Sequence, residues 1–421
     1  MTLACQGGPL GTIAVAGAAG SGKSTLGRAL ATALHLPLVD LDAVTNPLLD
    51  RLVGPVLPAH WLAAPHGELI REARYAALRA VAHDVVATAG GAVVVAPFTA
   101  ELTGGPEWTE LAAAVAPTEL HVVYIDGDPE LFARRRAARG AQRDAHRADG
   151  PARPPAVPHI TLAAALTPEQ LLARALRALG HRTAVDAANP LFGRPFEAVL
   201  FDLDGVLVDS TASVTRSWNQ FAVQFGVSAR ALQENHGQPA QTLVERLLGV
   251  DRIAEGLARI EAIEVADAKG VEAVPGARAL FASLPEHRRA VVTSGTPPIA
   301  TARLHAAGFP LPRTLITADD VTRGKPDPEP YLLAAQRLGV APDRCLAVED
   351  APAGIASARA AGCQVLAVTG TARAHELAEA ALTVDGLDRV AVHVDDEALR
   401  LTLATPADAA QPSSSAAARS R

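Results

Sequence analysis

Each half of the chain contains a short apolar strand that runs directly into a turn carrying glycine or aspartate. In the first half, residues 12–16 precede a glycine-rich turn and the helical pattern 25–34; in the second, residues 198–201 precede Asp202. Further apolar strands alternate with helical segments after both turns, which is the pattern of parallel sheets covered by helices on both faces. The sequence therefore predicts an α/β protein with two doubly wound parallel-sheet domains.

Changes of pattern along the chain predict the domain organisation. We expect a first domain over residues 1–180, a linker with Gly and Pro over 181–195 and a second domain over 196–404. A long helical stretch predicts a helical cap, inserted after the first strand of the second domain over about 213–273. The Ala-, Ser- and Pro-rich residues 405–421 are predicted to be a disordered tail.

Composition excludes several classes of protein. The net charge of −7 argues against a protein that coats nucleic acid or an anionic membrane. Three cysteines are too few for a disulfide framework or a thiolate zinc site. No apolar run approaches the roughly 18 residues of a spanning helix, and the first residues lack the features of a signal peptide. We expect a cytoplasmic enzyme that acts on small molecules, with no membrane or nucleic-acid partner.

The glycine-rich turn of the first half matches the Walker A pattern GxxxxGK[ST] between a strand and a helix. Its glycines let backbone N–H groups wrap phosphates, and the helix N-terminus adds a favourable dipole. Lys23 is expected to reach the β- and γ-phosphates of ATP, and Ser24 to ligate Mg²⁺. The predicted nucleotide-binding residues of this loop are Gly17, Gly20, Ser21, Gly22, Lys23, Ser24 and Thr25.

The segment AGAAGSGKSTLGRALA resembles P-loop small-molecule kinases of the gluconate and shikimate kinase type. The resemblance extends to an acidic strand end that contains Asp42 and to an arginine-bearing lid over residues 134–143. It implies that Asp42 accepts the proton of a substrate hydroxyl. It also implies that Arg136 and Arg139 of the lid bind the nucleotide and neutralise the phosphoryl group during transfer.

Four motifs occur in order along the second half, each at the end of a predicted strand. They are DLDGV from Asp202, VVTSGT with Ser294, GKPDPEPY with Lys325, and AVEDAPAGI with Glu349 and Asp350. Open α/β sheets bind their ligands at that edge. The motifs resemble the haloacid dehalogenase superfamily, and within it the beta-phosphoglucomutase-like branch, in particular glycerol-3-phosphatases and 2-deoxyglucose-6-phosphate phosphatases.

The resemblance implies a role for each catalytic side chain. Asp202 attacks phosphorus and forms an aspartyl-phosphate. Asp204 acts as general acid for the leaving oxygen and then as base for the attacking water. Ser294, or Thr293 if the register differs by one residue, donates to phosphate oxygens. Lys325 neutralises the phosphate and the nucleophile.

The same resemblance implies a Mg²⁺ site and a substrate contact. The ion would be held by Asp202, Asp350 and the main-chain carbonyl of Asp204, with Glu349 supporting the shell. In the cap, His236 and Gln238 lie where those relatives carry a substrate-facing segment. A His-Gly stop at the end of a helix is the alternative reading of that segment.

Lysine is rare in this chain. Lys23, Lys269 and Lys325 are its only lysines among 38 basic residues, and the others are arginines. A lysine retained in such a chain is a candidate for a role that needs a compact ammonium. Two of the three lie in phosphate-handling motifs.

Together these features predict a bifunctional enzyme. An Mg²⁺-dependent phosphatase for a small sugar or polyol phosphate would be fused to an ATP-binding kinase-like domain that phosphorylates a small metabolite. Three alternatives stay open: a phosphomutase, a polynucleotide kinase-phosphatase, and a first half that only binds nucleotide as a regulatory module.

Overall fold

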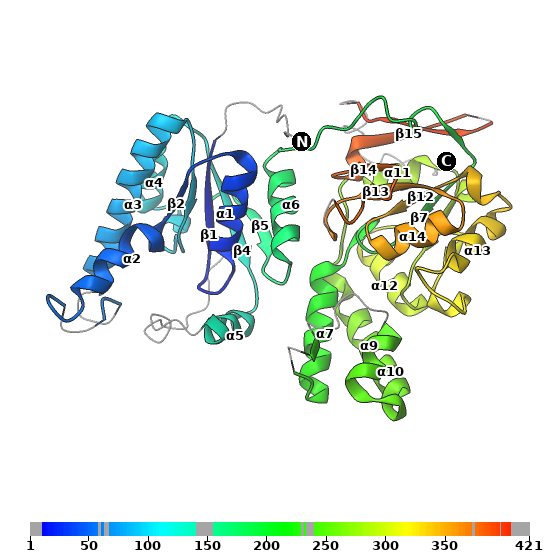
Figure 1. The fold of residues 1–421 in the computed structure, drawn as a ribbon, viewed down its shortest axis with the longest axis horizontal. Coiled ribbons are helices and arrows are strands. Elements are labelled where there is room, and N and C mark those ends of the chain that lie inside the picture. The colour runs from blue at the N-terminus through cyan, green and yellow to red at the C-terminus, as the bar shows by residue number, and fades with distance from the viewer. Residues whose placement is uncertain are drawn as a thin grey trace, which may run out of the picture. The chain divides into compact units, whose positions relative to one another are not determined.

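The structure is a computed structural model, which describes residues 11–57, 60–62, 67–139, 155–228, 231–232, 240–372, 375–395 and 397–405. The chain forms two compact units that divide between Arg182 and Thr183, called here the N-terminal and the C-terminal unit. Each contains its own parallel sheet with helices on both faces (Figure 1). The predicted fold class is therefore confirmed.

The sheet of the N-terminal unit has five strands in the order β2-β3-β1-β4-β5, all parallel to their neighbours. Its strands are β1 (Thr12–Gly17), β2 (Leu38–Asp40), β3 (Val93–Val95), β4 (Leu120–Asp126) and β5 (Ile160–Ala163). Every residue of β1 is buried. Because β1 is the central strand, the turn that follows it opens at the middle of the carboxyl edge of the sheet.

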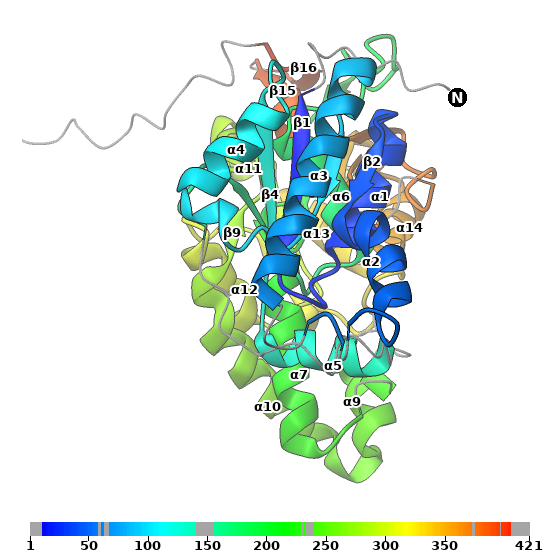
Figure 2. The ribbon, with the colours of Figure 1, turned by 90° about the vertical axis from the view of Figure 1, so that its left-hand side faces the viewer.

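Helices cover both faces of this sheet, and Figure 2 shows the longest, α3, along its length. The helices are α1 (Lys23–Leu34), α2 (Leu41–Leu52), α3 (Gly67–Ala89), α4 (Pro106–Ala114), α5 (Pro129–Arg139) and α6 (Pro168–Ala178). Side chains of a strand alternate between faces. Ala14 and Ala16 accordingly join an apolar cluster with α3 and α4, and Ile13 and Val15 join one with α1 and α6.

The sheet of the C-terminal unit has six parallel strands in the order β11-β10-β7-β12-β13-β14. They are β7 (Ala198–Phe201), β10 (Arg289–Val292), β11 (Leu315–Ile316), β12 (Cys345–Glu349), β13 (Gln364–Val368) and β14 (Leu382–Val384). The strands β6 (Pro195–Phe196), β15 (Val390–Val394) and β16 (Leu399–Leu403) form a separate antiparallel sheet. The carboxyl ends of β10, β7 and β12 are neighbours, so the turns after them meet.

Two apolar clusters pack helices onto the faces of the six-stranded sheet. The helices are α11 (Ala277–Ser283), α12 (Pro297–Ala306), α13 (Glu329–Leu338) and α14 (Pro352–Ala360). The first cluster contains Phe281 of α11 and Leu304 of α12, and the second contains Tyr331 of α13 and Ile355 of α14. Short 3-10 helices occur at Glu101–Thr103, Val250–Arg252, Ala268–Gly270, Glu286–Arg288, Ala318–Asp320, Pro342–Arg344 and Leu387–Arg389.

A helical cap is inserted after the first strand of the six-stranded sheet, as predicted. It contains α7 (Thr211–Phe225), α9 (Ala240–Leu248) and α10 (Ile253–Asp267), which pack around Trp218 and Phe221. The chain enters and leaves the cap through the antiparallel pair β8 (Val208–Asp209) and β9 (Glu272–Ala273). In both views the cap helices lie together beyond one end of the sheet (Figure 1, Figure 2).

The structure differs from the sequence expectation in its details. Asp42 is not at a strand end but in the first turn of α2, because Asp40 ends β2 and its side chain accepts a hydrogen bond from the Asp42 N–H as a helix cap. The strands without a counterpart in the sequence prediction are β5, β6, β8, β9, β14, β15 and β16. Lid residues 140–143 and the predicted tail from residue 406 onwards lie outside the described residues.

Candidate active site

Asp202 directly follows the buried strand β7, and its N–H donates to the carbonyl of Val348 on the neighbouring strand β12 at 2.9 Å. This backbone contact fixes Asp202 at the carboxyl edge of the sheet. Its side chain is buried, and burial raises the pKa of Asp202 to about 7, although the nearby Lys325 ammonium acts to lower that pKa. A carboxylate held in this way needs positive charge beside it.

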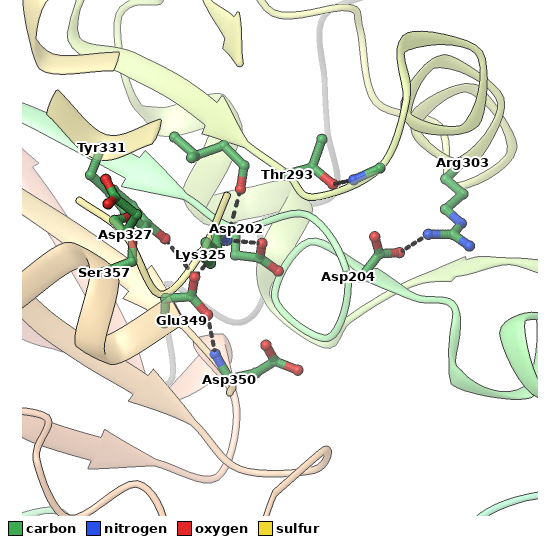
Figure 3. Close-up of polar contacts among 12 residues, drawn as sticks. Asp202, Asp204, Thr293, Arg303, Lys325, Asp327, Tyr331, Glu349, Asp350 and Ser357 are labelled. Atoms are coloured by element: carbon green, nitrogen blue, oxygen red, sulfur yellow. Dashed lines mark hydrogen bonds and ion pairs between the residues drawn. The ribbon is translucent and has the colours of Figure 1, made fainter. Parts of the chain in front are cut away.

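Lys325 supplies that charge. Its Nζ lies 2.5 Å from Oδ1 of Asp202, 2.6 Å from Oε1 of Glu349 and 3.1 Å from the carbonyl oxygen of Val292 (Figure 3). The side chain is only 8% exposed. Burial acts to lower the pKa of Lys325, but the attraction of Asp202 and Glu349 outweighs it and raises that pKa. Lys325 is therefore a buried cation between two carboxylates.

Glu349 and Asp350 complete an acidic cluster with Asp202. One ligand atom from each of the three lies within 4.8 Å of the others. Glu349 is 1% exposed and also accepts a hydrogen bond from the Tyr331 hydroxyl at 2.6 Å. Burial, and then the charges of Asp202 and Glu349, raise the pKa of Asp350. Three carboxylates facing one ammonium leave an excess of negative charge, and hard oxygen donors of this kind fit Mg²⁺.

Two glycines allow the acidic side chains to pack this closely. Gly205 has a φ of +85°, and a Cβ there would lie 1.8 Å from Oδ2 of Asp350. A Cβ on Gly354 of α14 would lie 1.9 Å from Oε1 of Glu349. Any side chain at either position would displace a carboxylate of the cluster.

Asp204 lies apart from this cluster and is 30% exposed. Its Oδ1 accepts from the Ser210 hydroxyl at 2.5 Å. It also accepts from Nη1 of Arg303 at 2.7 Å (Figure 3). Arg303 in turn reaches Glu264 of the cap, at 3.0 Å. Neither Arg303 nor Glu264 is among the site residues predicted from the sequence.

A signal for both of these residues is present in the sequence. Arg303 is four residues after the buried Ile299, and Glu264 is four residues after the buried Ile260, so each lies on the buried face of its helix. A charged residue at a position where the helical period predicts an apolar one is expected to have a charged partner.

Two candidates for the predicted phosphate-binding hydroxyl follow β10, and they differ in exposure. Thr293 is buried, and its Oγ1 accepts from the N–H of Gly295 at 3.0 Å. Ser294 is exposed at the same strand end. Ser294 is thus the better placed of the two to meet a ligand. The predicted cap residues His236 and Gln238 lie outside the described residues.

The Walker loop of the N-terminal unit joins β1 to α1. Gly20 and Gly22 have φ values of +89° and +100°, which only glycine adopts without strain, and α1 begins at Lys23. Nζ of Lys23 lies 3.3 Å from the carbonyl oxygen of Ala18. The Ser21 hydroxyl is buried and has no hydrogen-bond partner among the described residues. Ser24 is half-buried and Thr25 exposed in the first turn of α1.

The arginines of α5 contact this loop through its backbone. Nη1 of Arg136 donates to the carbonyl oxygen of Ala19 at 3.0 Å, and Nη1 of Arg135 donates to that of Ser21 at 3.4 Å. The side chain of Arg139 lies outside the described residues. The structure thus brings Arg136 to the Walker loop, as a nucleotide contact requires.

Asp42 is held by a buried arginine. Nη2 of Arg74, on α3, donates to Oδ1 of Asp42 at 2.7 Å. The same guanidinium contacts Thr45 and Asn46 of α2, and it lies over the ring of Trp61 with 4.6 Å between its Cζ and the ring centroid. Arg74 is not among the site residues predicted from the sequence, and its partners lie about 30 residues away along the chain.

Comparisons with known proteins match both units. Residues 196–362 match the family model described as haloacid dehalogenase-like hydrolase, and residues 13–153 match the model described as AAA domain. No helix in the described part of the chain is long and apolar enough to cross a membrane.

Three curated relatives are similar over less than half of this chain but over most of their own length. Hexitol phosphatase A of Escherichia coli is 43% identical over 199 residues, which is 46% of this chain and 92% of the relative. Validoxylamine A 7'-phosphate phosphatase of Streptomyces hygroscopicus is 36% identical over 46% of this chain and 96% of the relative. Glycerol-1-phosphate phosphohydrolase 2 of Saccharomyces cerevisiae is 33% identical, with coverages of 41% and 75%.

Proposed function

The chain belongs to the haloacid dehalogenase-like hydrolases, and from that membership we propose that its C-terminal unit is an Mg²⁺-dependent phosphatase for a small polyol or sugar phosphate. One observation carries the proposal: the Lys325 ammonium lies between Asp202 and Glu349, with Asp350 beside them. A dianionic phosphate can approach a carboxylate nucleophile only where cations offset the repulsion.

The first chemical step forms a covalent intermediate on Asp202. A carboxylate oxygen of Asp202 attacks phosphorus as the bond from phosphorus to the leaving oxygen breaks. Protonated Asp204 gives its proton to that leaving oxygen, so an alcohol departs and Asp204 becomes a carboxylate. Ser294 donates a hydrogen bond to a phosphate oxygen, and Lys325 keeps its charge beside the reacting oxygens.

The second step returns the enzyme to its starting state. Asp204, now ionised, accepts a proton from water while the water oxygen attacks phosphorus. The bond between phosphorus and Asp202 breaks, and inorganic phosphate leaves. Two protonation states of one side chain thereby serve both steps.

Mg²⁺ would be held by Asp202, Asp350 and the main-chain carbonyl of Asp204, with Glu349 behind them. When bound, the ion neutralises charge on the phosphate and on the nucleophile. Glu349 is anchored by Lys325 and Tyr331, which suits a supporting position better than a direct one. The raised pKa values of Asp202 and Asp350 fit a site that lacks positive charge.

The names of the relatives support the substrate class. Hexitol phosphatase A and glycerol-1-phosphate phosphohydrolase 2 are named for phosphate esters of open-chain polyols. A panel of hexitol, glycerol and sugar monophosphates, assayed with full-length protein and Mg²⁺, tests the proposal. We expect release of inorganic phosphate that stops with EDTA and is restored by excess Mg²⁺. Isomerised phosphate ester without release of phosphate would instead favour the phosphomutase, and inactivity on the whole panel would contradict the proposal.

For the N-terminal unit we propose ATP binding and phosphoryl transfer to a small metabolite. The Walker loop with its positive-φ glycines supports nucleotide binding, and the AAA-domain match is consistent with a P-loop kinase-like fold. Asp42 is the proposed base for the acceptor hydroxyl, and Arg136 and Arg139 the proposed contacts to the nucleotide. Lys23 and Ser24 would face the phosphates and Mg²⁺.

The kinase is best tested in full-length protein that carries Asp202→Asn. This substitution prevents the C-terminal site from hydrolysing a phosphorylated product before it is detected. Labelled ATP with a panel of polyols and sugars should give a labelled ester, and Lys23→Ala in the same background should lower the yield of that ester. ATP hydrolysis without any ester would favour the regulatory module, and label transferred only to a 5′-hydroxyl oligonucleotide added to the same panel would favour end repair.

A further inference from the structure

Arg303 connects two parts of the C-terminal unit that are separate in the sequence. It belongs to α12, packed on the sheet, yet Nη1 contacts Asp204 after β7 at 2.7 Å and Nη2 contacts Glu264 of the cap helix α10 at 3.0 Å. Figure 3 shows its guanidinium aimed at Asp204. One planar group thus joins the proposed proton-transfer residue to the cap.

The burial of this bridge argues against a general stabilising role. Arg303 is 4% exposed and Glu264 10%. Desolvating such charges offsets most of the free energy that their attraction contributes, and apolar side chains of similar volume often stabilise a fold as well or better. Nε of Arg303 is buried without a hydrogen-bond partner in the described part of the chain, so its hydrogen bonds there go to the two carboxylates.

The geometry at Asp204 indicates what the bridge does. Both Arg303 and Ser210 donate to Oδ1 of Asp204, so neither contact uses Oδ2. Two donors on one oxygen fix the orientation of the carboxyl group, and Oδ2 can then face the leaving group. A misplacement of about 1 Å in a reacting group can lower a rate by roughly a hundredfold.

We propose that Arg303 is a positioning residue that orients Asp204 for proton transfer, and that Glu264 of the cap holds Arg303 in place. This inference rests on the proposed function, because it assigns the proton transfer to Asp204. It adds that a residue of the cap acts on the chemistry through Arg303 rather than by touching the substrate. Lysine cannot replace Arg303, since one ammonium does not span both carboxylates as the fork of a guanidinium does.

The test uses the dependence of the first step on the leaving group. A hexitol leaves as an alkoxide unless it is protonated, whereas p-nitrophenolate leaves without a proton. Single-turnover rates of leaving-group release are measured for full-length protein in excess over a hexitol phosphate or p-nitrophenyl phosphate. The variants are Arg303→Lys and Glu264→Gln. Arg337→Lys is the control for the change of arginine to lysine in an ion pair, because Arg337 forms a 2.6 Å pair with Asp320 through a side chain that is 42% exposed.

We expect Arg303→Lys to slow release of the hexitol by roughly a hundredfold, and release of p-nitrophenolate by less than about threefold. Glu264→Gln should also slow release of the hexitol more than release of p-nitrophenolate, with a loss of about tenfold for the hexitol. Arg337→Lys should change neither rate. Thermal unfolding checks that each variant is folded at the assay temperature. Equal losses on both substrates, or no loss with either variant, would overturn the proposal.

Asp204→Asn separates this inference from the proposed function. If Asp204→Asn lowers both rates equally, the proton-transfer role of Asp204 fails, and the bridge fails with it. If Asp204→Asn discriminates between the two substrates but Arg303→Lys and Glu264→Gln do not, only the bridge is wrong.

Discussion

The two candidate sites lie at the same kind of sheet edge but are built from different groups. In the C-terminal unit the groups are side chains of opposite charge, with Lys325 in contact with Asp202 and Glu349. In the N-terminal unit the groups are mostly backbone, because Gly20 and Gly22 turn the chain and α1 begins at the loop. Attraction between charged side chains organises the C-terminal site, and the conformation of the backbone organises the Walker loop.

This difference predicts different sensitivity to substitution. A cluster of charged side chains depends on every member, because removing one leaves the others unbalanced in a buried place. A backbone loop keeps its N–H donors whichever side chain is changed. Single substitutions should therefore reduce function more in the C-terminal site than in the Walker loop.

The largest effect is expected for Asp202→Asn. The amide keeps the shape of the side chain but is not a nucleophile toward phosphorus, so kcat for phosphate release should fall at least about a thousandfold. Steady-state phosphatase assays with Mg²⁺ measure it. The comparison between the two regions breaks down if Lys23→Ala, in the other unit, lowers the same kcat to a similar extent.

Lys325→Arg should have the next largest effect. The substitution keeps the charge, but the wider guanidinium cannot occupy the position 2.5 Å from Asp202 and 2.6 Å from Glu349 without displacing one of them. We expect kcat/KM to fall about a hundredfold. Lys269→Arg is the control, because Lys269 is exposed and lies in no motif. Equal small effects at both positions would mean that Lys325 is not a specific contact.

Lys23→Ala should give a smaller effect, confined to the binding of nucleotide. Loss of one charged contact to phosphate is worth about 2 kcal/mol, so ATP affinity should fall about thirtyfold while some binding by the backbone persists. Isothermal titration with ATP and Mg²⁺ measures this loss. Phosphatase activity of this variant should stay within about twofold of wild type. Unchanged ATP affinity would show that Lys23 does not contact the nucleotide.

How much of this could be predicted from the sequence depends on what brings the partners together. Asp202, Lys325 and Glu349 come together because the topology of a parallel sheet places the turns after neighbouring strands at one edge. The pairs Arg303–Glu264 and Arg74–Asp42 join residues 39 and 32 positions apart on different helices. Such contacts depend on how the helices pack, which the sequence pattern does not specify.

The smallest effect concerns stability and pH in metal-free protein. Burial raises the pKa of Asp202 to about 7 in the folded state, against about 4 in the unfolded chain. A raised carboxyl pKa means that its contribution to stability is fully present below about pH 4 and is lost as the pH rises toward 7. Asp202→Asn removes this loss of stability with rising pH, because the amide does not ionise.

Thermal unfolding in EDTA checks the sign. The Tm of Asp202→Asn relative to wild type should increase between about pH 4 and pH 7, because the wild type alone must bury the ionising carboxyl. Saturating Mg²⁺ should reduce the difference, since the ion favours the carboxylate. A Tm difference that shrinks as the pH rises would show that the carboxylate is stabilised in the metal-free fold.

Trapping of the covalent intermediate tests the central claim, that Asp202 is the nucleophile of an Mg²⁺-dependent phosphatase. Full-length Asp204→Asn protein is mixed with Mg²⁺ and p-nitrophenyl phosphate, whose leaving group needs no proton, and is quenched in acid. Without a base to activate water, the phosphorylated enzyme should accumulate. Peptide mass spectrometry should find one phosphoryl group on Asp202, and none when Asp202→Asn is added. A phosphoryl group on another residue, or turnover of p-nitrophenyl phosphate by the Asp202→Asn protein at the wild-type rate, would contradict the claim.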